Sequence, residues 1–492
     1  MQRPDDLFDR QVEWDDLLDF VGGDDPIRIG IVYGRRRQGK SWLLRRTVRQ
    51  AGGLYTMALQ HDRQSALRRV AGSLASLSSL PGIRFELADW EEALRSARTV
   101  LDQAGQRVLV LDEYPYLLEH SPELSSVLQA FYDDVRNDRN GKPLRILLCG
   151  SAISVMEELL SGSSPLRGRT NLEMLLRPFD FRQAARYWRI TDPELAFVVH
   201  AVLGGTAGYP DLVQIGPPAS PSELPRWLAQ TVLNPSSALF SEDAYLLRED
   251  PRIRDRAPYF AVLEAVSAGK STPTAIGGAI GRDKSALAHP LDVLTTAGFL
   301  VHDDDVRKQR RPSIRIADPL VRFHQLITRP RLWQFEERRY EEAWAAAQQT
   351  FASQILGPHF EHLCREWVRL FASADSTGEP VGDVGRTTVN DPRNRRTHEL
   401  DVVALSAGER SQDRTARVAV IGEAKSSSSR RTIADLQLRD HLRRLLAAEG
   451  ADCEQARLLL FGRSGFDHNL QSTAALRSDV ELIDLDRLYR GS

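Results

Sequence analysis

The segment GRRRQGKS at 34–41 has the residue types and spacing that most clearly predict chemistry. It fits the pattern G-x-x-x-x-G-K-[ST], in which glycines allow a tight turn and backbone N–H groups surround phosphate oxygens. The N-terminus of the helix that follows adds partial positive charge. We expect Lys40 to contact the β- and γ-phosphates of a nucleotide and Ser41 to ligate Mg²⁺. A chance Gly/Lys turn is disfavoured, because an apolar run directly precedes the motif.

The rest of the predicted nucleotide site follows two further apolar runs. LVLDEYPYL at 109–117 places Asp112 and Glu113 at the end of a strand, where open α/β sheets bind ligands. We expect Asp112 to hold Mg²⁺ and Glu113 to act as general base on the attacking water. Ser151 follows the run at 145–150 and either orients that water or caps a helix. The predicted cofactor-binding residues are Gly34, Arg35, Arg36, Arg37, Gln38, Gly39, Lys40, Ser41, Trp42, Asp112, Ser151 and Arg169.

Arg167 and Arg169, in SPLRGRT, are candidates for neutralising charge on the transferring phosphoryl group, in the same chain or in a neighbouring subunit. Arginine is abundant throughout the chain, so an ordinary surface role is a strong alternative. Trp42 is bulkier than the residue usual at its position, which gives no reason to doubt binding.

A second group of ionisable residues lies near the C-terminus. ELDVVAL at 399–405 carries Glu399 and Asp401 on one face of a predicted strand, and VIGEAK carries Glu423 and Lys425 with the same spacing. If the two strands pair as a hairpin, the carboxylates converge and bind Mg²⁺ through oxygen ligands. Lys425 would then position or activate water beside a metal-bound phosphate. The alternative is a solvated strand face with an ion pair; the scarcity of lysine, at six positions only, favours the first reading.

Several ordered motifs resemble the archaeal-type ATPase family, a branch of the P-loop STAND/AAA-like NTPases. They are FDRQVEWDDLL, VYGRRRQGKS, VLDEYPYL, CGSAISVM, LRGRTNLEMLLRPF and LGGTAGYP, within residues 5–250. The resemblance implies ATP as the nucleotide and the order Walker A, Walker B, sensor 1. It also implies that GGTAGYP packs near the nucleotide at the start of a helical lid.

The D…E-x-K arrangement over residues 351–465 resembles the PD-(D/E)xK nucleases and the uncharacterised domain often fused to archaeal-type ATPases. This resemblance implies a metal site of Glu361, Asp401 and Glu423, with Asp401, Glu423 and Lys425 as catalytic residues alongside Lys40 and Glu113 of the ATPase. Gln437 would brace the site. Cleavage itself stays open, because sequence geometry does not show metal occupancy.

The elements that must position these residues follow from the apolar pattern. Runs at 27–34, 54–59, 107–114 and 145–151 do not alternate and are separated by helices, which predicts a buried parallel sheet. The predicted fold class is α/β, with four parts. They are a P-loop ATPase core (1–190), a helical lid (191–250), a winged helix-turn-helix (251–330) and a restriction-endonuclease-like α/β domain (331–492).

Basic residues suggest nucleic acid as a partner. Three predicted helices and two strands at 257–317 have the layout of a winged helix, whose turn carries Arg307, Lys308, Arg310 and Arg311. We expect this wing over DNA phosphates and the third helix, with Lys284, Ser285 and His289, near the major groove. A spacer or oligomer contact is an equal alternative. Arg386, Arg393, Arg395 and Arg396 offer further phosphate contacts, although a solvated turn is the simpler reading.

Composition sets outer limits on function. The 492 residues include 65 Lys and Arg against 67 Asp and Glu, which excludes a histone-like basic protein. No apolar run reaches the roughly 18 residues of a membrane helix, no secretory signal is evident, and the three cysteines lie far apart. We therefore expect a cytoplasmic ATPase with ATP, Mg²⁺ and DNA as ligands. A homo-oligomer formed through the ATPase domain is one option for its assembly. The context would be genome maintenance, mobile elements or defence; the alternative is an ATP-dependent DNA-binding switch that does not cleave.

Overall fold

A computed structural model describes residues 2–78, 85–138, 141–253, 255–309 and 313–492. Contacts between residues divide the chain into two compact units. Unit 1 comprises Met1–Pro178, Thr206–Tyr209 and Ala244–Arg254, and unit 2 comprises Phe179–Gly205, Pro210–Asp243 and Asp255–Ser492. The four predicted ranges stay a prediction.

Unit 1 is built on a five-stranded parallel sheet in the order β2-β3-β4-β1-β5. The strands are β1 (Ile27–Tyr33), β2 (Gly53–Met57), β3 (Val108–Asp112), β4 (Leu144–Gly150) and β5 (Thr170–Leu175). The first four confirm the predicted strands. The edge strand β5 was not predicted.

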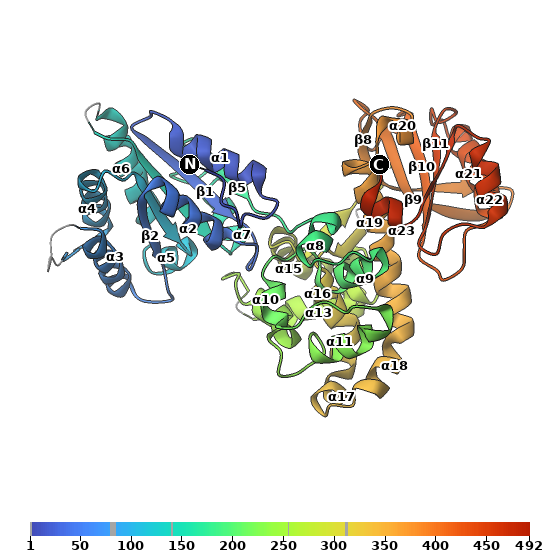
Figure 1. Cartoon of the computed structure of the whole chain (residues 1–492), viewed down its shortest axis with the longest axis horizontal. Helices are drawn as coiled ribbons and strands as arrows, with labels where there is room; N and C mark the ends of the chain where they lie inside the picture. The colour runs from blue at the N-terminus through green and yellow to red at the C-terminus, as the bar shows by residue number, and fades with distance from the viewer. Residues whose placement is uncertain (1, 79–84, 139–140, 254, 310–312) are drawn as a thin grey trace. The chain divides into compact units, whose positions relative to one another are not determined.

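Helices cover both faces of this sheet. On one face lie α1 (Gln11–Gly22) and α2 (Lys40–Ala51), packed on Val32, Val110 and Leu147. On the other lie α3 (Arg63–Leu77), α4 (Trp90–Gln103), α5 (Tyr114–His120), α6 (Leu124–Asn137) and α7 (Ile153–Glu158). Helices α3 and α4 lie side by side (Figure 1). Because strands buried on both faces need apolar side chains on both, they read as continuous apolar runs.

Unit 2 begins with helices and one β-hairpin. The helices before the hairpin are α8 (Phe181–Tyr187), α9 (Pro193–Leu203), α10 (Tyr209–Val213), α11 (Leu224–Gln230), α13 (Ala257–Ser267), α14 (Pro273–Ile280) and α15 (Lys284–Thr296). Helix α12 (Glu242–Leu247) precedes α13 and lies mostly within the range of unit 1. Strands β6 (Leu300–Asp303) and β7 (Ser313–Ile316) are antiparallel. The elements α13–α15 and β6–β7 occur in the order expected of a winged helix.

The expectation that Arg307 and Lys308 form an exposed basic wing is wrong. Both side chains are buried, at 0% and 3% exposure. Arg307 donates to the Arg414 carbonyl oxygen at 2.7 Å, and the Lys308 ammonium lies 3.0 Å from a Glu449 carboxylate oxygen. The segment after β6 is therefore anchored to the C-terminal sheet, and its charge is used within the fold. Arg310 and Arg311 lie outside the described residues.

The last part of unit 2 is a mixed five-stranded sheet in the order β12-β11-β10-β9-β8. Its strands are β8 (Val381–Asp391), β9 (Arg396–Ser406), β10 (Val418–Lys425), β11 (Arg457–Gly462) and β12 (Val480–Ile483). Strands β8, β9 and β10 are antiparallel neighbours, and β10, β11 and β12 run parallel. The predicted hairpin between 399–405 and 417–425 is thus confirmed as β9 and β10.

Helices enclose the mixed sheet. Before it come α16 (Pro319–Phe323), α17 (Leu332–Glu336), α18 (Tyr340–Thr350), α19 (Gly357–Leu370) and α20 (Ala374–Thr377). Helix α19 packs against β8, β9 and β10. Helices α21 (Ile433–Ala448) and α22 (His468–Ala475) contribute Leu442, Leu446 and Leu470 to the core beside β9, β10 and β11, and α23 (Leu485–Arg490) ends the chain.

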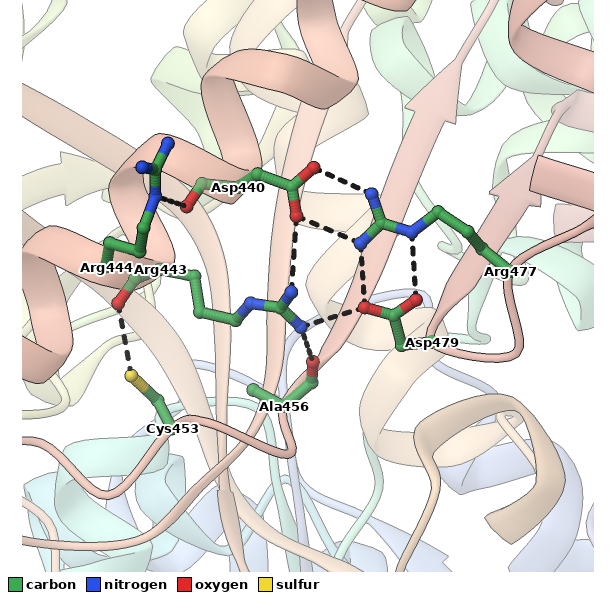
Figure 2. A network of polar contacts seen from close by, with 7 residues as sticks. All are labelled: Asp440, Arg443, Arg444, Cys453, Ala456, Arg477 and Asp479. Atoms are coloured by element: carbon green, nitrogen blue, oxygen red, sulfur yellow. Dashed lines mark hydrogen bonds and ion pairs between the residues drawn. The ribbon is translucent and has the colours of Figure 1, made fainter. Parts of the chain in front are cut away.

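A polar network ties α21 to the start of β12 (Figure 2). Arg477 donates to both carboxylate oxygens of Asp440 and to Asp479, with distances from 2.7 to 3.0 Å. Arg443 joins the same two carboxylates at 3.2 and 2.9 Å. The arginines hold the pKa of Asp479 down to about 2. Among the described residues no helix is both long and apolar enough to cross a membrane.

Candidate functional site

Two glycines shape the loop between β1 and α2. Gly34 has φ +145°, and a Cβ added there would lie 2.4 Å from the Leu176 carbonyl oxygen. Gly39, just before the first residue of α2, has φ +92°. Side chains are disfavoured at both positions, so the sequence pattern is explained by backbone geometry. The loop leads directly into the N-terminus of α2, where partial positive charge favours phosphate.

Lys40 is held across this loop. Its ammonium is buried and donates to the carbonyl oxygens of Gly34 at 2.6 Å and Arg35 at 2.9 Å. Phosphate oxygens are stronger acceptors than these carbonyls because they carry charge. A bound nucleotide would therefore draw the ammonium from these carbonyl oxygens toward its phosphates.

The predicted magnesium ligands of the ATPase lie together. Ser41 Oγ donates to Asp112 Oδ2 at 2.6 Å, and Asp112 is 1% exposed. A hydroxyl and a carboxylate oxygen are the hard ligands that Mg²⁺ prefers. Tyr55 on β2 also donates to Asp112 Oδ2, and burial together with this carboxylate raises the Tyr55 pKa. Sequence reasoning missed Tyr55, because only the pairing of β2 with β3 brings it there.

Glu113 occupies a left-handed backbone conformation with φ +54°. Burial and the neighbouring Asp112 raise its pKa. Ser151 Oγ donates to Glu113 Oε2 at 3.2 Å. The first residue before α7 is Ala152, and α7 has no side-chain cap, so the alternative role of Ser151 as a helix cap is not observed. Ser151 instead orients the candidate base.

Two later segments of unit 1 contact the phosphate loop. Gln38 donates to Thr206 Oγ1 at 3.3 Å, and the Gly208 N–H donates to the Arg37 carbonyl at 2.9 Å. This places GGTAGYP against the loop, as the family resemblance implied. Arg36 pairs with Glu249 at 2.9 Å, and burial raises the Glu249 pKa to about 6. No local motif marks Glu249, so it was missed from the sequence.

The expectation that Arg169 binds the nucleotide within its own chain is wrong. Arg169 directly precedes β5, and Thr170 pairs with Ile29 near the start of β1. Because β1 and β5 are parallel and the phosphate loop follows the end of β1, Arg169 lies at the opposite edge of the sheet. Its guanidinium forms two bonds to Asp133 on α6, at 2.9 and 3.1 Å. Trp42 is 38% exposed on α2, beneath the Arg46 guanidinium.

The acidic site of unit 2 lies where β9, β10 and α19 meet. Asp401 Oδ2 accepts a hydrogen bond from the Ala424 N–H at 3.1 Å, which sets it beside Glu423. Arg365 on α19 donates to the Asp401 carbonyl oxygen at 2.7 Å. Burial, reinforced by the charge of Asp401, raises the pKa of both Glu361 and Glu423 to about 7. Burial also raises the pKa of Asp401. The three carboxylates thus repel one another in a partly buried site, and a bound cation would relieve this repulsion.

Positive side chains already occupy part of this site. Arg439 on α21 is 3% exposed and lies 2.8 Å from Glu423 Oε2. Lys425 is 3.8 Å from Asp435, which Arg431 also approaches at 3.5 Å. In the described part of the chain, no three His, Cys, Asp or Glu side chains are placed to hold a metal ion as they stand. A metal at Glu361, Asp401 and Glu423 would require Glu423 to turn away from Arg439.

Gln437 and the arginines predicted to contact phosphates lie in different surroundings in the structure. Gln437 is exposed on α21, so Arg439, two residues later, is the residue that braces Glu423. Arg393, Arg395 and Arg396 are exposed at the turn between β8 and β9, whereas Arg386 pairs with Asp303 at 3.3 Å. Arg439 falls on the buried face of α21, but nothing in the sequence shows which buried arginine meets which carboxylate.

Comparison with known proteins supports the ATPase part. Residues 7–193 match the family described as an ATPase domain predominantly from Archaea. An uncharacterised protein of Methanocaldococcus jannaschii is 24% identical over 383 residues, covering 76% of this chain and 79% of that protein. The chain therefore contains an ATPase domain of the archaeal type.

One solved structure shows a related fold, and a second is more distantly similar. A Walker-type ATPase of Pyrococcus abyssi is similar with a TM-score of 0.50 and 21% identity, covering 66% of this chain and 97% of that structure. The ORC2 protein of Aeropyrum pernix is 14% identical with a TM-score of 0.44, covering 70% and 97%. The likeness to the Pyrococcus structure agrees with the parallel sheet of unit 1.

Proposed function

We propose that this chain binds and hydrolyses ATP with Mg²⁺ in unit 1 and that nucleotide binding controls metal-dependent cleavage of DNA by unit 2. The bond of 2.6 Å between Ser41 Oγ and Asp112 Oδ2 carries the first half, because it joins the two predicted metal ligands from separate motifs. The archaeal-type ATPase domain supports ATP hydrolysis as the reaction.

The residues of unit 1 would have different roles in ATP hydrolysis. Lys40 and the backbone N–H groups of 34–41 would hold the phosphates, and Mg²⁺ at Ser41 and Asp112 would neutralise charge on the β- and γ-phosphates. The loop is already shaped for this by Gly34 and Gly39.

Glu113 would orient the attacking water and accept its proton. Its raised pKa makes the carboxylate a better base than an exposed glutamate. Ser151 keeps that carboxylate in place through the bond of 3.2 Å. The proton passes from water to Glu113 as the bond between water oxygen and the γ-phosphorus forms and the β–γ bridge breaks.

The cleavage half rests on the order of elements around Asp401. The chain first forms a helix that bears Glu361 and then three antiparallel strands that bear Asp401, Glu423 and Lys425. A helix and a parallel strand follow. The raised pKa values of Glu361 and Glu423 mark a cluster of carboxylates that favours a cation. Mg²⁺ held there would activate water against a phosphodiester, with Lys425 positioning that water.

A second candidate is a DNA-binding switch that does not cleave. The specific observation in its favour is the ion pair between Arg439 and Glu423, 2.8 Å long and almost wholly buried, which uses one metal ligand within the fold. In that case the arginine replaces the metal, and unit 2 holds DNA without hydrolysing it.

Cleavage of plasmid and linear DNA with Mg²⁺ or Mn²⁺, with and without ATP, tests the proposal. Wild type is compared with Lys40→Ala and Lys425→Ala, and exposed lysines supply matched controls, Lys142→Ala in unit 1 and Lys270→Ala in unit 2. We expect cleavage to be lost in Lys425→Ala, altered in its ATP response in Lys40→Ala, and unchanged in both controls. ATP turnover without any cleavage by wild type would favour the switch instead.

A further inference from the structure

A large cleft lies within unit 2, next to the acidic site. Its volume is about 1130 Å³, slightly above the roughly 300–1,000 Å³ typical of small-molecule sites. One wall is formed by the end of α13 and by β6 and β7, and the other by the segment from α16 to α19. Such a volume has room for several units of a polymer.

Arginine dominates the charged lining of this cleft. Six arginines face three carboxylates, those of Glu264, Asp303 and Glu361, and the described lining includes no lysine. The arginines are Arg315, Arg322, Arg329, Arg331, Arg365 and Arg386. The whole chain has a formal charge of −2, so this concentration of positive charge is local. Clefts lined by one sign of charge focus the field on ligands of the other sign.

Carboxylates neutralise these arginines only in part. Outside the lining, Asp243 pairs with Arg329 at 3.2 Å and Glu399 with Arg386 at 3.5 Å. Asp303 is shared, at 3.3 Å from Arg386 and 3.9 Å from Arg315. The side chain of Arg322 approaches His359 at 3.3 Å, and its Nε has no hydrogen-bond partner. Burial and the charge of Arg315 lower the Arg322 pKa to about 10, against the opposing effect of Asp318. A buried guanidinium in this setting favours an anionic ligand.

The cleft leads to the acidic site. Glu361 lines it, and so does Arg365, whose guanidinium also reaches the Asp401 carbonyl oxygen at 2.7 Å. An anion seated among the arginines is therefore next to the carboxylates proposed to hold the metal. Phosphodiesters bind arginine clusters through paired hydrogen bonds and meet metal ions in nucleases, so both features suit the same ligand.

The form of the cleft favours one strand over a duplex. The lining arginines come from β7, from β8 and from the segment between α16 and α19, so a strand in the cleft meets arginines of several elements. A duplex is instead contacted by a protein element that enters its groove. The described lining includes no aromatic side chain, so bases have no stacking platform and contacts go to the backbone. Arg307 and Lys308, which would contact duplex phosphates from a wing, are buried.

We propose that this arginine-lined cleft binds the phosphodiester backbone of a single nucleic-acid strand, without base preference, and leads it to Glu361 and Asp401. The proposal rests on the function proposed for unit 2 and names the form of its substrate and the path by which that substrate arrives.

Binding of a fluorescein-labelled single-stranded DNA oligonucleotide, followed by anisotropy in EDTA without nucleotide, tests this directly. The cleft variant is Arg331→Gln with Arg386→Gln. The control is Arg444→Gln with Arg490→Gln, which removes equal charge from exposed positions outside the cleft. We expect the Kd to rise at least tenfold in the cleft variant and less than twofold in the control. The slope of log K against log salt should fall by about 0.7 for each lost phosphate contact.

Further variants and a duplex ligand distinguish the possible results of this binding experiment. Arg331→Lys with Arg386→Lys should keep most of the affinity, which separates loss of charge from loss of folding. Unchanged affinity in the glutamine variant, or loss in Lys284→Gln on α15 instead, would overturn the cleft assignment. Equal or tighter binding of duplex would overturn the preference for one strand. Because binding in EDTA needs no catalysis, failure of wild type to cleave with Mg²⁺ counts against the nuclease alone.

Discussion

Glu113 combines an unfavourable backbone conformation with a side chain that is a candidate for chemistry. A left-handed conformation is uncommon for residues other than glycine and costs free energy, so it persists only where the surroundings enforce it. Here the turn from β3 into α5 enforces it and brings the carboxylate to Ser151. The strained backbone, burial and hydrogen bond together distinguish Glu113, which directly precedes α5, from the exposed Glu119 on α5.

Replacing this carboxylate by an amide should separate binding from hydrolysis. We expect Glu113→Gln to bind ATP with nearly wild-type affinity and to lower kcat for phosphate release by about 10²–10⁴-fold, because the amide cannot accept a proton. Steady-state phosphate release and binding of a fluorescent ATP analogue measure the two quantities. Glu119→Gln is the control, and a Glu113→Gln enzyme with more than a third of wild-type kcat would remove Glu113 from the role of base.

At the scale of elements, burial decides which strands the sequence reveals. Strands β1, β3 and β4 are covered on both faces and stand out as continuous apolar runs. The edge strand β5 alternates exposed and partly buried residues and contains Asn171 and Glu173, so its apolar signal is weak. The prediction of an exposed basic wing was wrong for a related reason. Charge in a turn predicts exposure, but Arg307 and Lys308 are buried because they contact acceptors in a distant part of the chain.

The same distinction applies to the candidate sites. Lys40, Ser41 and Asp112 belong to motifs whose spacing is set by local backbone geometry, so the sequence predicts them. Asp401 and Glu423 follow from the two-residue period of strands once the hairpin is assumed. Tyr55, Glu249 and Arg439 reach their sites only through tertiary packing. Their partners lie far away in the sequence or on another element, and no periodicity records such a contact.

The network of Figure 2 gives a prediction about the stability of unit 2. Arg477→Met removes four hydrogen bonds, two to Asp440 on α21 and two to Asp479 at the start of β12. We expect a loss of about 1–2 kcal/mol in the free energy of unfolding, since the charges are partly shielded. Urea denaturation measures it. The control is Arg490→Met, whose pair with Asp486 is mostly exposed and should contribute under about 1 kcal/mol. Equal effects of the two changes would contradict a structural role for the network.

Helix α19 carries a second glutamate whose burial should make stability depend on pH. Burial and Asp180 raise the pKa of Glu366 to about 7, above the value of about 4.3 in an unfolded chain. Between these two pH values the folded state binds more protons than the unfolded state, so the free energy of unfolding falls as pH rises.

Glu366→Gln removes this proton linkage. We expect the variant to be more stable than wild type at pH 8, by up to about 3 kcal/mol, and nearly equal to it at pH 4.5. Thermal unfolding across this pH range measures the difference. The control is Glu454→Gln, because Glu454 is exposed beyond α21. A stability difference that does not vary with pH would contradict the assignment.

At the scale of the whole molecule, the path of the chain links the two units. Segments Thr206–Tyr209 and Ala244–Arg254 belong to unit 1, yet the residues on both sides of each belong to unit 2. Both segments contact the phosphate loop, through Thr206 and Glu249. We therefore expect a change at the nucleotide to be transmitted through these covalent connections into unit 2, and each contact is a place where that coupling can be removed without replacing a catalytic residue.

Glu249 offers the sharper test of this coupling, because its pair with Arg36 depends on charge. We expect Glu249→Gln to keep ATP hydrolysis within about threefold of wild type while lowering the effect of nucleotide on DNA affinity, a coupling of typically 1–3 kcal/mol. The measured quantity is the ratio of DNA Kd values with and without a non-hydrolysable ATP analogue. In wild type the ratio should approach that of the variant below about pH 6, where Glu249 is protonated and its ion pair with Arg36 is weakened. Exposed Glu158→Gln should behave as wild type, and a Glu249→Gln protein with an unchanged ratio would show that the signal passes elsewhere.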